Sequence, residues 1–386
     1  MLKIMAVFGT RPEAIKMAPL VQELKKYPDE IDCKVVVTAQ HREMLDQVLG
    51  LFKISPDHDL DIMRPNQNLF DITSRALSGL QAVFQSERPG LVLVHGDTTT
   101  TFTAALAAYY LQIPVGHVEA GLRTYDKFSP FPEEINRHLT GVLADLHFAP
   151  TPTARRNLLS EGISSKNIFV TGNTVIDALL ATVRQGYKFT DPVLSKIDYG
   201  RRRVLLVTTH RRENLGEPMR EIYQALREVV TFYQDVEVIF PVHKNPLVRD
   251  VVKEELGGLK RVHLIDPLEY QPFVNLIGCS YLVLSDSGGL QEEAPALGKP
   301  VLVLRNTTER PEAVTAGTVR LVGAAREDVA SETRRLLDDR GFYSKMANAI
   351  NPYGDGCASQ RILQAIKFKF GISQRAVEEF YPPNLS

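Results

Sequence analysis

The sequence predicts an α/β protein with two doubly wound, Rossmann-like domains that face a cleft. Strand-like apolar runs alternate with amphipathic helical patterns along the whole chain. This alternation stops once, in a polar stretch from Phe189 to Arg203, and then restarts. The chain has 386 residues, too many for one compact core. Because a βαβα order produces parallel sheets covered by helices, we expect two such sheets, with ligands bound outside the carboxyl ends of the strands.

In the first half, apolar runs predict buried strands at residues 3–8, 33–38, 91–95, 115–118 and 168–170. Amphipathic helices are predicted between them. The first places its apolar side chains on one face, at Ala14, Met17, Ala18, Val21 and Leu24. Another is the alanine-rich segment 101–111. These elements make up the first predicted domain, residues 1–190.

In the second half, strands are predicted at residues 204–208, 236–240, 262–265, 281–284, 301–304 and 319–322. The polar stretch before them is interpreted as an interdomain linker, and the second domain is predicted to span residues 191–357. A final segment, residues 358–386, begins with a helix over 358–370. We expect this helix to pack back on the first domain and the tail to be weakly structured after Glu379.

Composition excludes several classes of protein. The 45 basic and 46 acidic residues nearly cancel, whereas a nucleic-acid-binding surface needs a basic surplus. Cys33, Cys279 and Cys357 lie far apart, without the spacing of a metal site or a disulfide framework. No run reaches the roughly 20 apolar residues of a membrane span, and the N-terminus lacks a signal-peptide pattern. We expect a cytoplasmic protein that does not bind nucleic acid or membrane.

A glycine pair, Gly288-Gly289, lies in the stretch SDSGGLQEE between a predicted strand and a predicted helix. Glycine lets the backbone approach a ligand closely, and the first N–H groups of a helix attract phosphate. Ser287 adds a hydroxyl donor, and Glu293 is placed to accept hydrogen bonds from ribose hydroxyls. A plain turn whose acids satisfy the helix dipole would give the same pattern, so this motif alone leaves both interpretations open.

Three acids follow predicted strands or open a helix in the first domain. Asp97 follows the strand 91–95 in HGDTTTT, Glu119 follows 115–118 in HVEAGLRT, and Glu133 lies at a helix start in FPEEINRH. Asp97 alone could be a helix cap, and Glu133 alone could balance a helix dipole. All three are expected at the same face of the domain, and together they indicate proton transfer.

Basic residues also follow the strands. Arg11 and Lys16 lie in and after GTRPE, where they could hold an anion or simply cap a helix. In the second domain, His210 and Arg211 lie in THRREN and His243 lies in PVHKNP. Histidines beside arginines at strand ends favour an anion site in the same cleft.

The motifs give no sign of a cofactor. The first strand is followed by GTRPE rather than GxGxxG, so a nicotinamide cofactor is not expected. The chain also lacks an HExxH motif. The three acids could hold Mg²⁺, but the basic residues can neutralise a diphosphate without it, and we expect no metal.

Ten motifs in this order resemble the non-hydrolysing UDP-N-acetylglucosamine 2-epimerases of bacteria. The resemblance runs from about residue 3 to residue 370. The motifs are GTRPEAIKMAP, TAQHREMLDQ, VHGDTTTT, GHVEAGLRT, PEEINR, TGNTVIDAL, HRREN, DSGGLQEEAP, GKPVLVLRNTTERPEA and NPYGDG. The resemblance implies the type-B glycosyltransferase architecture and the interconversion of UDP-N-acetylglucosamine and UDP-N-acetylmannosamine.

The resemblance also assigns the substrate contacts. It implies that Ser287, Gly288 and Gly289 contact phosphate, that Glu293 contacts the ribose, and that Arg11 and His210 face the diphosphate. Asp97, Glu119 and Glu133 would surround the sugar, with Lys16 nearby. His210 and Lys16 are counted with the three acids as catalytic residues.

The implied chemistry is an anti elimination of UDP to 2-acetamidoglucal, followed by re-addition. Bacterial members are also activated by UDP-N-acetylglucosamine at a second site, which Gln40, Glu133, Arg211 and His243 would line here. Family members often have a basic residue where this chain has Asn66, a difference that bears on this second site and not on catalysis. The family suggests a homodimer.

Three alternatives remain open from the sequence. One is a hydrolysing epimerase that releases UDP and free N-acetylmannosamine. The others are a type-B glycosyltransferase and a non-catalytic sugar-nucleotide sensor. Solvent deuterium at C2 of the sugar would exclude the sensor.

Overall fold

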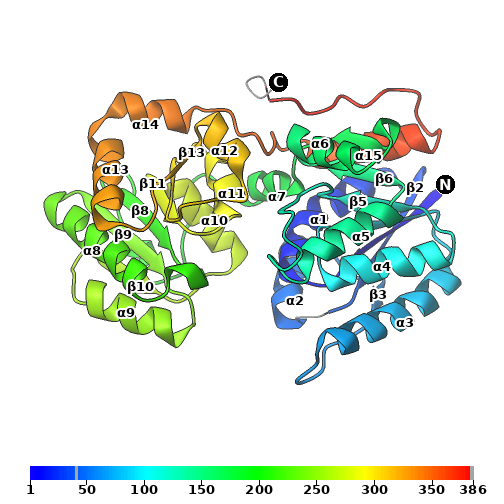
Figure 1. Cartoon of the computed structure of the whole chain (residues 1–386), viewed down its shortest axis with the longest axis horizontal. Coiled ribbons are helices and arrows are strands. Elements are labelled where there is room, and N and C mark those ends of the chain that lie inside the picture. The colour runs from blue at the N-terminus through cyan, green and yellow to red at the C-terminus, as the bar shows by residue number, and fades with distance from the viewer. Residues whose placement is uncertain (40–41, 383–386) are drawn as a thin grey trace. The chain divides into compact units, whose positions relative to one another are not determined.

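The computed structural model describes residues 1–39 and 42–382. Residue contacts divide the chain into two compact units. The first unit comprises residues 1–181 and 353–381, and the second comprises residues 182–352 with Pro382. Each unit is an α/β layer structure with helices around one parallel sheet (Figure 1).

The sheet of the first unit has seven parallel strands in the order β3-β2-β1-β4-β5-β6-β7. Their bounds are β1 Leu2–Phe8, β2 Ile31–Val37, β3 His58–Asp59, β4 Leu91–His95, β5 Val115–Val118, β6 Leu146–Ala149 and β7 Ile168–Val170. The central strands are buried on both faces, which explains why they read as continuous apolar runs.

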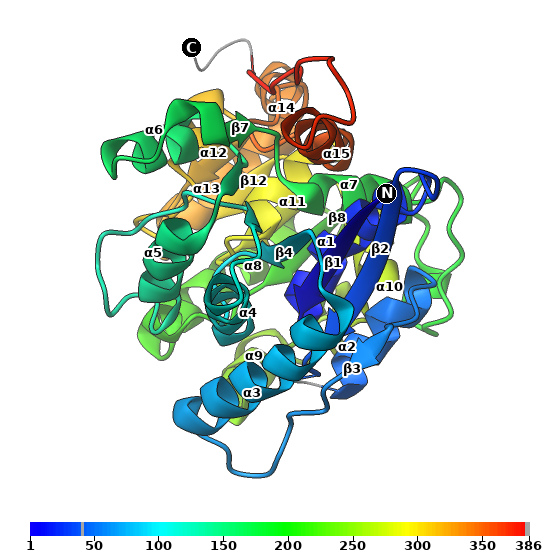
Figure 2. The same ribbon diagram turned by 90° about the vertical axis from the view of Figure 1, so that its right-hand side faces the viewer.

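Helices cover both faces of this sheet. They are α1 Arg11–Leu24, α2 Arg42–Leu51, α3 Leu69–Glu87, α4 Thr99–Tyr110, α5 Glu133–Leu143, α6 Pro152–Ser160, α7 Thr174–Thr182 and α15 Ala358–Lys369. Helices α3, α4 and α5 pack side by side, while α1 packs against α2 and α15 (Figure 2). One face of the core joins Met5 and Val7 of β1 to apolar residues of α3 and α4.

The sheet of the second unit has six parallel strands in the order β10-β9-β8-β11-β12-β13. They are β8 Arg203–Thr208, β9 Val236–Pro241, β10 Val262–Ile265, β11 Leu282–Ser285, β12 Val301–Val303 and β13 Val319–Leu321. The helices are α8 Glu217–Phe232, α9 Pro246–Leu256, α10 Tyr270–Cys279, α11 Leu290–Ala296, α12 Pro311–Ala316, α13 Arg326–Asp338 and α14 Arg340–Ala347. The core of this unit is continuous from α8 through β8 and β11 to α13.

The prediction of two parallel, doubly wound sheets is confirmed. Two strands were not predicted. The strand β3 has only two residues, and β6 contains the polar His147, which interrupts its apolar pattern. Within the described residues, none of the helices has the length and apolar character needed to cross a membrane.

The chain passes between the units near residues 181 and 352, rather than at the predicted boundaries near 190 and 357. The difference has a physical reason. The stretch interpreted as a linker packs within the second unit, where the ring of Phe189 lies 5.1 Å from that of Tyr187 and 5.5 Å from that of Tyr199. Helix α15 belongs to the first unit and packs on α1, and Lys367 forms an ion pair with Glu30.

Strand order reverses between β1 and β4 in the first sheet and between β8 and β11 in the second. In open α/β sheets, the loops after such neighbouring strands diverge and leave a crevice at their carboxyl ends. The predicted site residues fall largely in these loops: residues 9–16 and 97 after β1 and β4, and residues 210–211 and 286–289 after β8 and β11.

Candidate active site

Glu119 follows β5 at the carboxyl edge of the first sheet. Its backbone has a φ of 63°, an unusual conformation for a residue other than glycine and one that is common at functional sites. Its side chain is only 7% exposed. The Lys16 ammonium donates to Oε1 of Glu119, and the amide of Asn173 donates to the same oxygen at 2.9 Å. The structure therefore brings together two predicted residues, Glu119 and Lys16.

Asp97 follows β4 and is held by α5. The guanidinium of Arg137 donates from Nε to Oδ2 of Asp97 at 2.8 Å, and Nη2 lies 2.6 Å from the same oxygen. The amide of Asn136 donates to the backbone carbonyl of Asp97 at 2.9 Å. Asp97 is thus a paired carboxylate and not a helix cap, because Thr98 caps α4 instead.

Helix α5 begins at Glu133, whose Oε2 is buried without a hydrogen-bond partner among the described residues. Its neighbour Glu134 has a structural role. It is 1% exposed and accepts from the backbone N–H groups of Thr124 and Tyr125 and from Arg137. Burial acts to raise the pKa of Glu134, but these donors hold it below its usual value.

Three buried histidines lie on adjacent strands of this sheet: His95 on β4, His117 on β5 and His147 on β6. Burial disfavours their charged forms and lowers the pKa of each, to about 4, about 3 and about 4 respectively. All three are therefore neutral at pH 7.

Another acid of the motif GTRPE, Glu13, is a capping residue of the fold. It accepts from the backbone N–H of Thr10 at 2.8 Å and from the hydroxyl of Thr98 at 2.7 Å. It therefore ties the loop after β1 to the loop after β4. Arg11, at the start of α1, is half-buried and forms no ion pair with the described residues.

In the second unit, Asp286 organises the loop after β8. It is fully buried and follows β11. Its carboxylate accepts from the backbone N–H of His210 and of Arg211, both at 2.9 Å, and from the amide of Asn214 at 3.0 Å. The motifs THRREN and SDSGG are therefore one structural element, joined through a carboxylate that sequence reasoning did not single out.

His210 lies on this element, and His243 lies after β9. Nδ1 of His210 is 3.3 Å from Oδ1 of Asp286, and the two imidazole rings stack with centroids 5.8 Å apart. Burial lowers the pKa of His210, against the opposing effect of Asp286. Arg211 and His243 are brought to the same loop cluster, and Nε of Arg211 is buried without a hydrogen-bond partner among the described residues. Gln40 lies outside the described residues.

The backbone conformation of the pair Gly288-Gly289 does not require glycine. Gly289 has a φ of −63°, which any residue can adopt. A Cβ added at Gly288 would lie 3.9 Å from Nη2 of Arg211, and one at Gly289 would lie 3.6 Å from a carboxylate oxygen of Glu293. These are ordinary contacts, so the fold itself would accept a side chain. What a side chain would remove is access to the backbone of residues 287–289.

Of the two acids after the glycine pair, Glu292 is structural. It is 2% exposed, its carboxylate pairs with Arg310, and its carbonyl accepts from the amide of Asn351 at 2.8 Å. Glu293 is half-buried, and its carboxylate lies beside Gly289. The structure thus gives the two neighbouring acids different surroundings.

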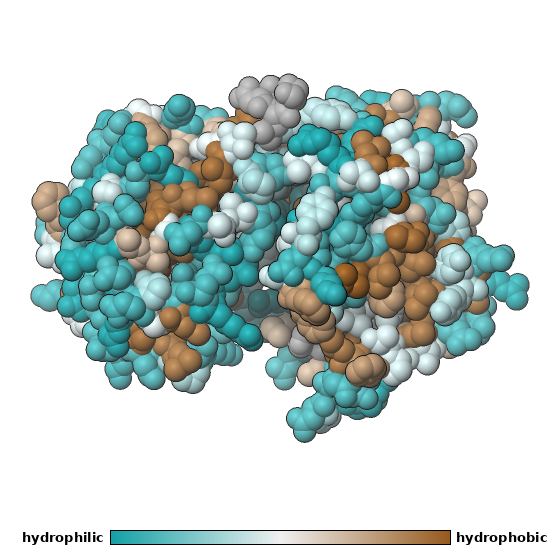
Figure 3. All heavy atoms as spheres, in the orientation of Figure 1, coloured by the Kyte–Doolittle hydropathy of each residue, from teal (hydrophilic) through white to brown (hydrophobic). Residues whose placement is uncertain are grey.

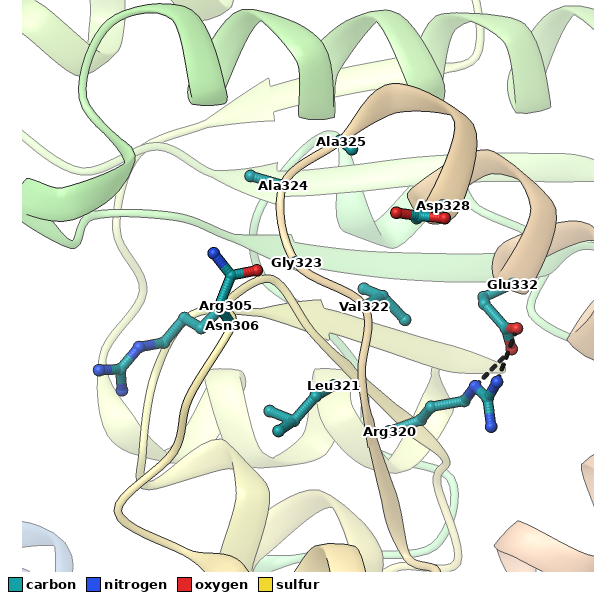
Figure 4. Close-up of a pocket in the computed structure, with 10 residues that line it drawn as sticks. All are labelled: Arg305, Asn306, Arg320, Leu321, Val322, Gly323, Ala324, Ala325, Asp328 and Glu332. Carbon is teal, nitrogen blue, oxygen red and sulfur yellow. Dashed lines mark hydrogen bonds and ion pairs between the residues drawn. The ribbon is translucent and has the colours of Figure 1, made fainter.

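No group of three or more His, Cys, Asp or Glu residues that could hold a metal ion occurs in the described part of the chain. A cavity of about 290 Å³ lies elsewhere in the second unit, at the ends of β12 and β13 (Figure 4). Arg305, Asn306 and Gly323 line it, with the Arg320–Glu332 ion pair at one side. It contains none of the predicted site residues.

Comparison with known proteins agrees with the resemblance. The family model of UDP-N-acetylglucosamine 2-epimerase matches residues 22–367. The UDP-N-acetylglucosamine 2-epimerase of Bacillus subtilis (strain 168) is 58% identical over 379 residues, which cover 98% of each chain. A crystal structure of the UDP-GlcNAc 2-epimerase from Neisseria meningitidis, bound to UDP-GlcNAc, is 52% identical with a TM-score of 0.84 and covers 95% of this chain and 99% of that one. A co-structure of S. aureus MnaA with UDP is 50% identical with a TM-score of 0.89 and covers 99% and 100%.

Proposed function

Because this chain belongs to the UDP-N-acetylglucosamine 2-epimerase family and is an epimerase of UDP-N-acetylglucosamine, we propose that it works without hydrolysis. The proposed reaction interconverts UDP-N-acetylglucosamine and UDP-N-acetylmannosamine reversibly. It uses no redox cofactor and no metal. The proposed place is the cytoplasm, where the product would supply N-acetylmannosamine units for cell-surface polysaccharide synthesis.

The proposed chemistry avoids a bare carbanion at C2, whose hydrogen is weakly acidic because no carbonyl is adjacent. A base removes the C2 hydrogen while the C1–O bond to UDP breaks, and the electron pair forms the C1=C2 bond of 2-acetamidoglucal. UDP then adds back through its phosphate oxygen to C1, and an acid delivers a proton to the opposite face of C2. Such proton transfers are each worth roughly 10²–10⁴-fold in rate.

The proton-transfer groups are assigned to the first unit. Asp97 and Glu119 are each held by a cationic partner, Arg137 and Lys16 respectively, which orients a carboxylate before the substrate arrives. Glu133 is assigned as the third acid. The buried, unpartnered Oε2 of Glu133 supports a contact with a substrate hydroxyl or amide.

UDP binding is assigned mainly to the second unit. The open backbone of residues 287–289 would accept the diphosphate, and Glu293 would accept hydrogen bonds from the ribose. His210, fixed by Asp286, would donate to the leaving phosphate, with Arg11 as a further cation. Donors at the diphosphate make UDP a better leaving group. The observation that carries this assignment is the side-chain-free turn at Gly288-Gly289 beside the guanidinium of Arg211.

The test is a reaction with UDP-N-acetylglucosamine in D₂O, followed by proton NMR. We expect deuterium at C2 of both epimers and no requirement for added NAD or divalent cation. Free N-acetylmannosamine accumulating together with UDP would instead identify a hydrolysing epimerase. Product that retains the original hydrogen at C2 would contradict the elimination mechanism.

We also propose that UDP-N-acetylglucosamine activates the enzyme at a second site lined by Gln40, Glu133, Arg211 and His243. The unpartnered Nε of Arg211 supports a contact with an anionic ligand. The test measures the rate of the reverse reaction, which starts from UDP-N-acetylmannosamine, as UDP-N-acetylglucosamine is added. A sigmoidal dependence of this rate on added UDP-N-acetylglucosamine would support the second site. Hyperbolic kinetics in UDP-N-acetylmannosamine that do not change when UDP-N-acetylglucosamine is added would contradict it.

The proposed oligomer is a homodimer formed through α4 and α5. Ile135, Leu139 and Val142 repeat at helical spacing on α5, and all three are exposed, Val142 to 78%. Tyr109 and Tyr110 are also exposed at the end of α4. Apolar side chains gather over these helices in the space-filling view (Figure 3). Contiguous exposed apolar surface of this kind is typical of an interface between subunits.

A further inference from the structure

His95 is the last residue of β4 and lies directly beside the strand that leads to Glu119. Its main chain is in register with Val118, the residue before Glu119. Its side chain is 4% exposed, and neither ring nitrogen has a hydrogen-bond partner among the described residues. A buried polar group without a partner is costly and usually has a functional reason.

His117, the neighbouring buried histidine on β5, differs from His95 in one respect. Its Nε2 lies 2.7 Å from the carbonyl oxygen of Gly96, a partner in the fold that explains its presence. The ring of His95 forms no such bond to another of the described residues, and the carboxylate of a proposed proton-transfer residue lies just beyond hydrogen-bond distance of it.

That group is the carboxylate of Glu119. Nε2 of His95 lies 3.7 Å from Oε2 of Glu119, just beyond hydrogen-bond distance. The donors Lys16 and Asn173 both contact the other oxygen, Oε1. These donors favour the ionised form of Glu119. A residue that removes a proton and later returns one must also be stable in its protonated form.

We propose that His95 is a positioning residue for Glu119: its neutral ring, with hydrogen on Nδ1, accepts a hydrogen bond from Oε2 whenever Glu119 is protonated. The inference rests on the proposed function, in which Glu119 gains and loses the proton of C2. In that step the C2–H bond breaks and an O–H bond forms on Oε2. The proton stays on Glu119, and His95 only accepts the hydrogen bond.

The surroundings of His95 keep it neutral, as this role requires. The charged and titratable groups that act on it are Glu119, Lys16 of α1 and His117 of β5. Burial is the largest effect and outweighs the attraction of Glu119 for an imidazolium, so the pKa of His95 is lowered to about 4. A neutral imidazole can accept a hydrogen bond, whereas an imidazolium cannot.

The test uses two amides of different length. The amide of His95→Gln reaches the position of Nε2 and can offer its oxygen to Glu119, whereas that of His95→Asn reaches only the position of Nδ1. We expect His95→Asn to lower kcat for deuterium incorporation about 10–100-fold at unchanged KM, and His95→Gln to stay within about threefold of wild type. His147→Asn, which removes another buried histidine of the same sheet, is the matched control and should keep wild-type kcat.

A second measurement needs no substrate. Carbon-13 NMR titration of the Glu119 carboxyl should give a lower pKa in His95→Asn than in wild type and an unchanged pKa in His95→Gln. Nitrogen-15 NMR of the wild-type protein at pH 7 should show the His95 hydrogen on Nδ1. The proposal is overturned if that hydrogen is on Nε2, if His95→Asn leaves kcat and the Glu119 titration unchanged, or if His95→Gln loses as much as His95→Asn. A wild-type protein that exchanges no deuterium at C2 would refute the proposed function, and the two NMR measurements would still decide the role of His95.

Discussion

Replacing Asp286 by Asn is the sharpest test of how the second unit builds its loops. The carboxylate of Asp286 is fully buried and accepts from three donors, on His210, Arg211 and Asn214. An amide oxygen can keep all three hydrogen bonds but without the negative charge. Its NH₂ group would also face the backbone N–H of His210, which lies 3.2 Å from Oδ1.

The magnitude follows from these contacts. A hydrogen bond to a charged acceptor is worth about 1.5–3 kcal/mol, and a neutral one about 0.5–1.5 kcal/mol, so each donor loses about 1 kcal/mol. Three donors give a loss of about 3 kcal/mol in the free energy of unfolding. For a unit of this size, each kcal/mol lowers Tm by about 2–4 °C, so the expected decrease is about 6–12 °C.

The assay is differential scanning calorimetry of wild type and Asp286→Asn, with UDP binding measured by isothermal titration calorimetry. Because Asp286 positions His210 and Arg211, we expect UDP affinity to fall at least about tenfold as well. Glu254→Gln is the control, since it removes an exposed partner of Arg220 and should leave both Tm and UDP affinity unchanged. An Asp286→Asn variant that unfolds at the wild-type temperature would refute the argument.

The remaining predictions concern the first unit. Asp97→Asn and Glu119→Gln should each lower the rate of deuterium incorporation at C2 by about 10²–10⁴-fold and leave the affinity for UDP near that of wild type. NMR measures the first quantity and calorimetry the second. A variant that loses UDP binding but still incorporates deuterium would contradict the assignment. The three buried histidines have folded-state pKa values below their unfolded value of 6.5, so the unfolded chain binds more protons as pH falls below 6.5. The stability that each contributes is lost from pH 6.5 down to about 4 for His95 and His147, and down to about 3 for His117. In this window each histidine lowers the free energy of unfolding by about 1.4 kcal/mol per pH unit, so Tm should be lower at pH 5 than at pH 7. His147→Asn should reduce this difference in Tm. An equal Tm of the wild-type protein at both pH values would refute the reasoning. Leu139→Glu on α5 should convert the proposed dimer to a monomer in sedimentation velocity, whereas Phe232→Ser, at an exposed position of the second unit, should not. A dimer that Leu139→Glu leaves unchanged would exclude this surface.

The parts of the fold that follow a local rule were predictable. Strands 91–95, 115–118, 168–170 and 262–265 were predicted to the residue because buried parallel strands are short, continuous apolar runs between turns. The two-residue β3 and the histidine-containing β6 carry too little of this signal. The linker assignment placed a polar stretch between domains, but its aromatic rings pack inside the second unit, a tertiary effect that local polarity does not report.

The candidate site also has a part that was predictable from the sequence and a part that was not. The positions of Asp97, Glu119 and Gly288 at strand ends followed from topology, since loops after parallel strands meet at one edge of a sheet. Their partners did not, because Arg137, Asn173 and other holding groups come from distant segments. The sequence signal for Asp286 was present, as an acid directly after a buried strand like Asp97. Glu293 alone was predicted as the ribose contact, but the structural role of Glu292 was not visible, because both acids lie in the first turn of α11 and the partner of Glu292, Arg310, comes from another segment.

The path of the chain between the two units has a consequence for synthesis on the ribosome. The second unit is continuous from residue 182 to residue 352, whereas the first is interrupted and is completed only by residues 353–381, including α15. Domains tend to fold as units while the chain emerges. The second unit can therefore mature while the first still waits for its last helix, which packs on α1, the helix that carries Lys16. A chain that ends after residue 352 would contain the continuous part of the second unit, to which UDP binding is assigned, but would lack the segment that completes the first unit. Such a truncation should therefore abolish turnover while UDP binding is retained.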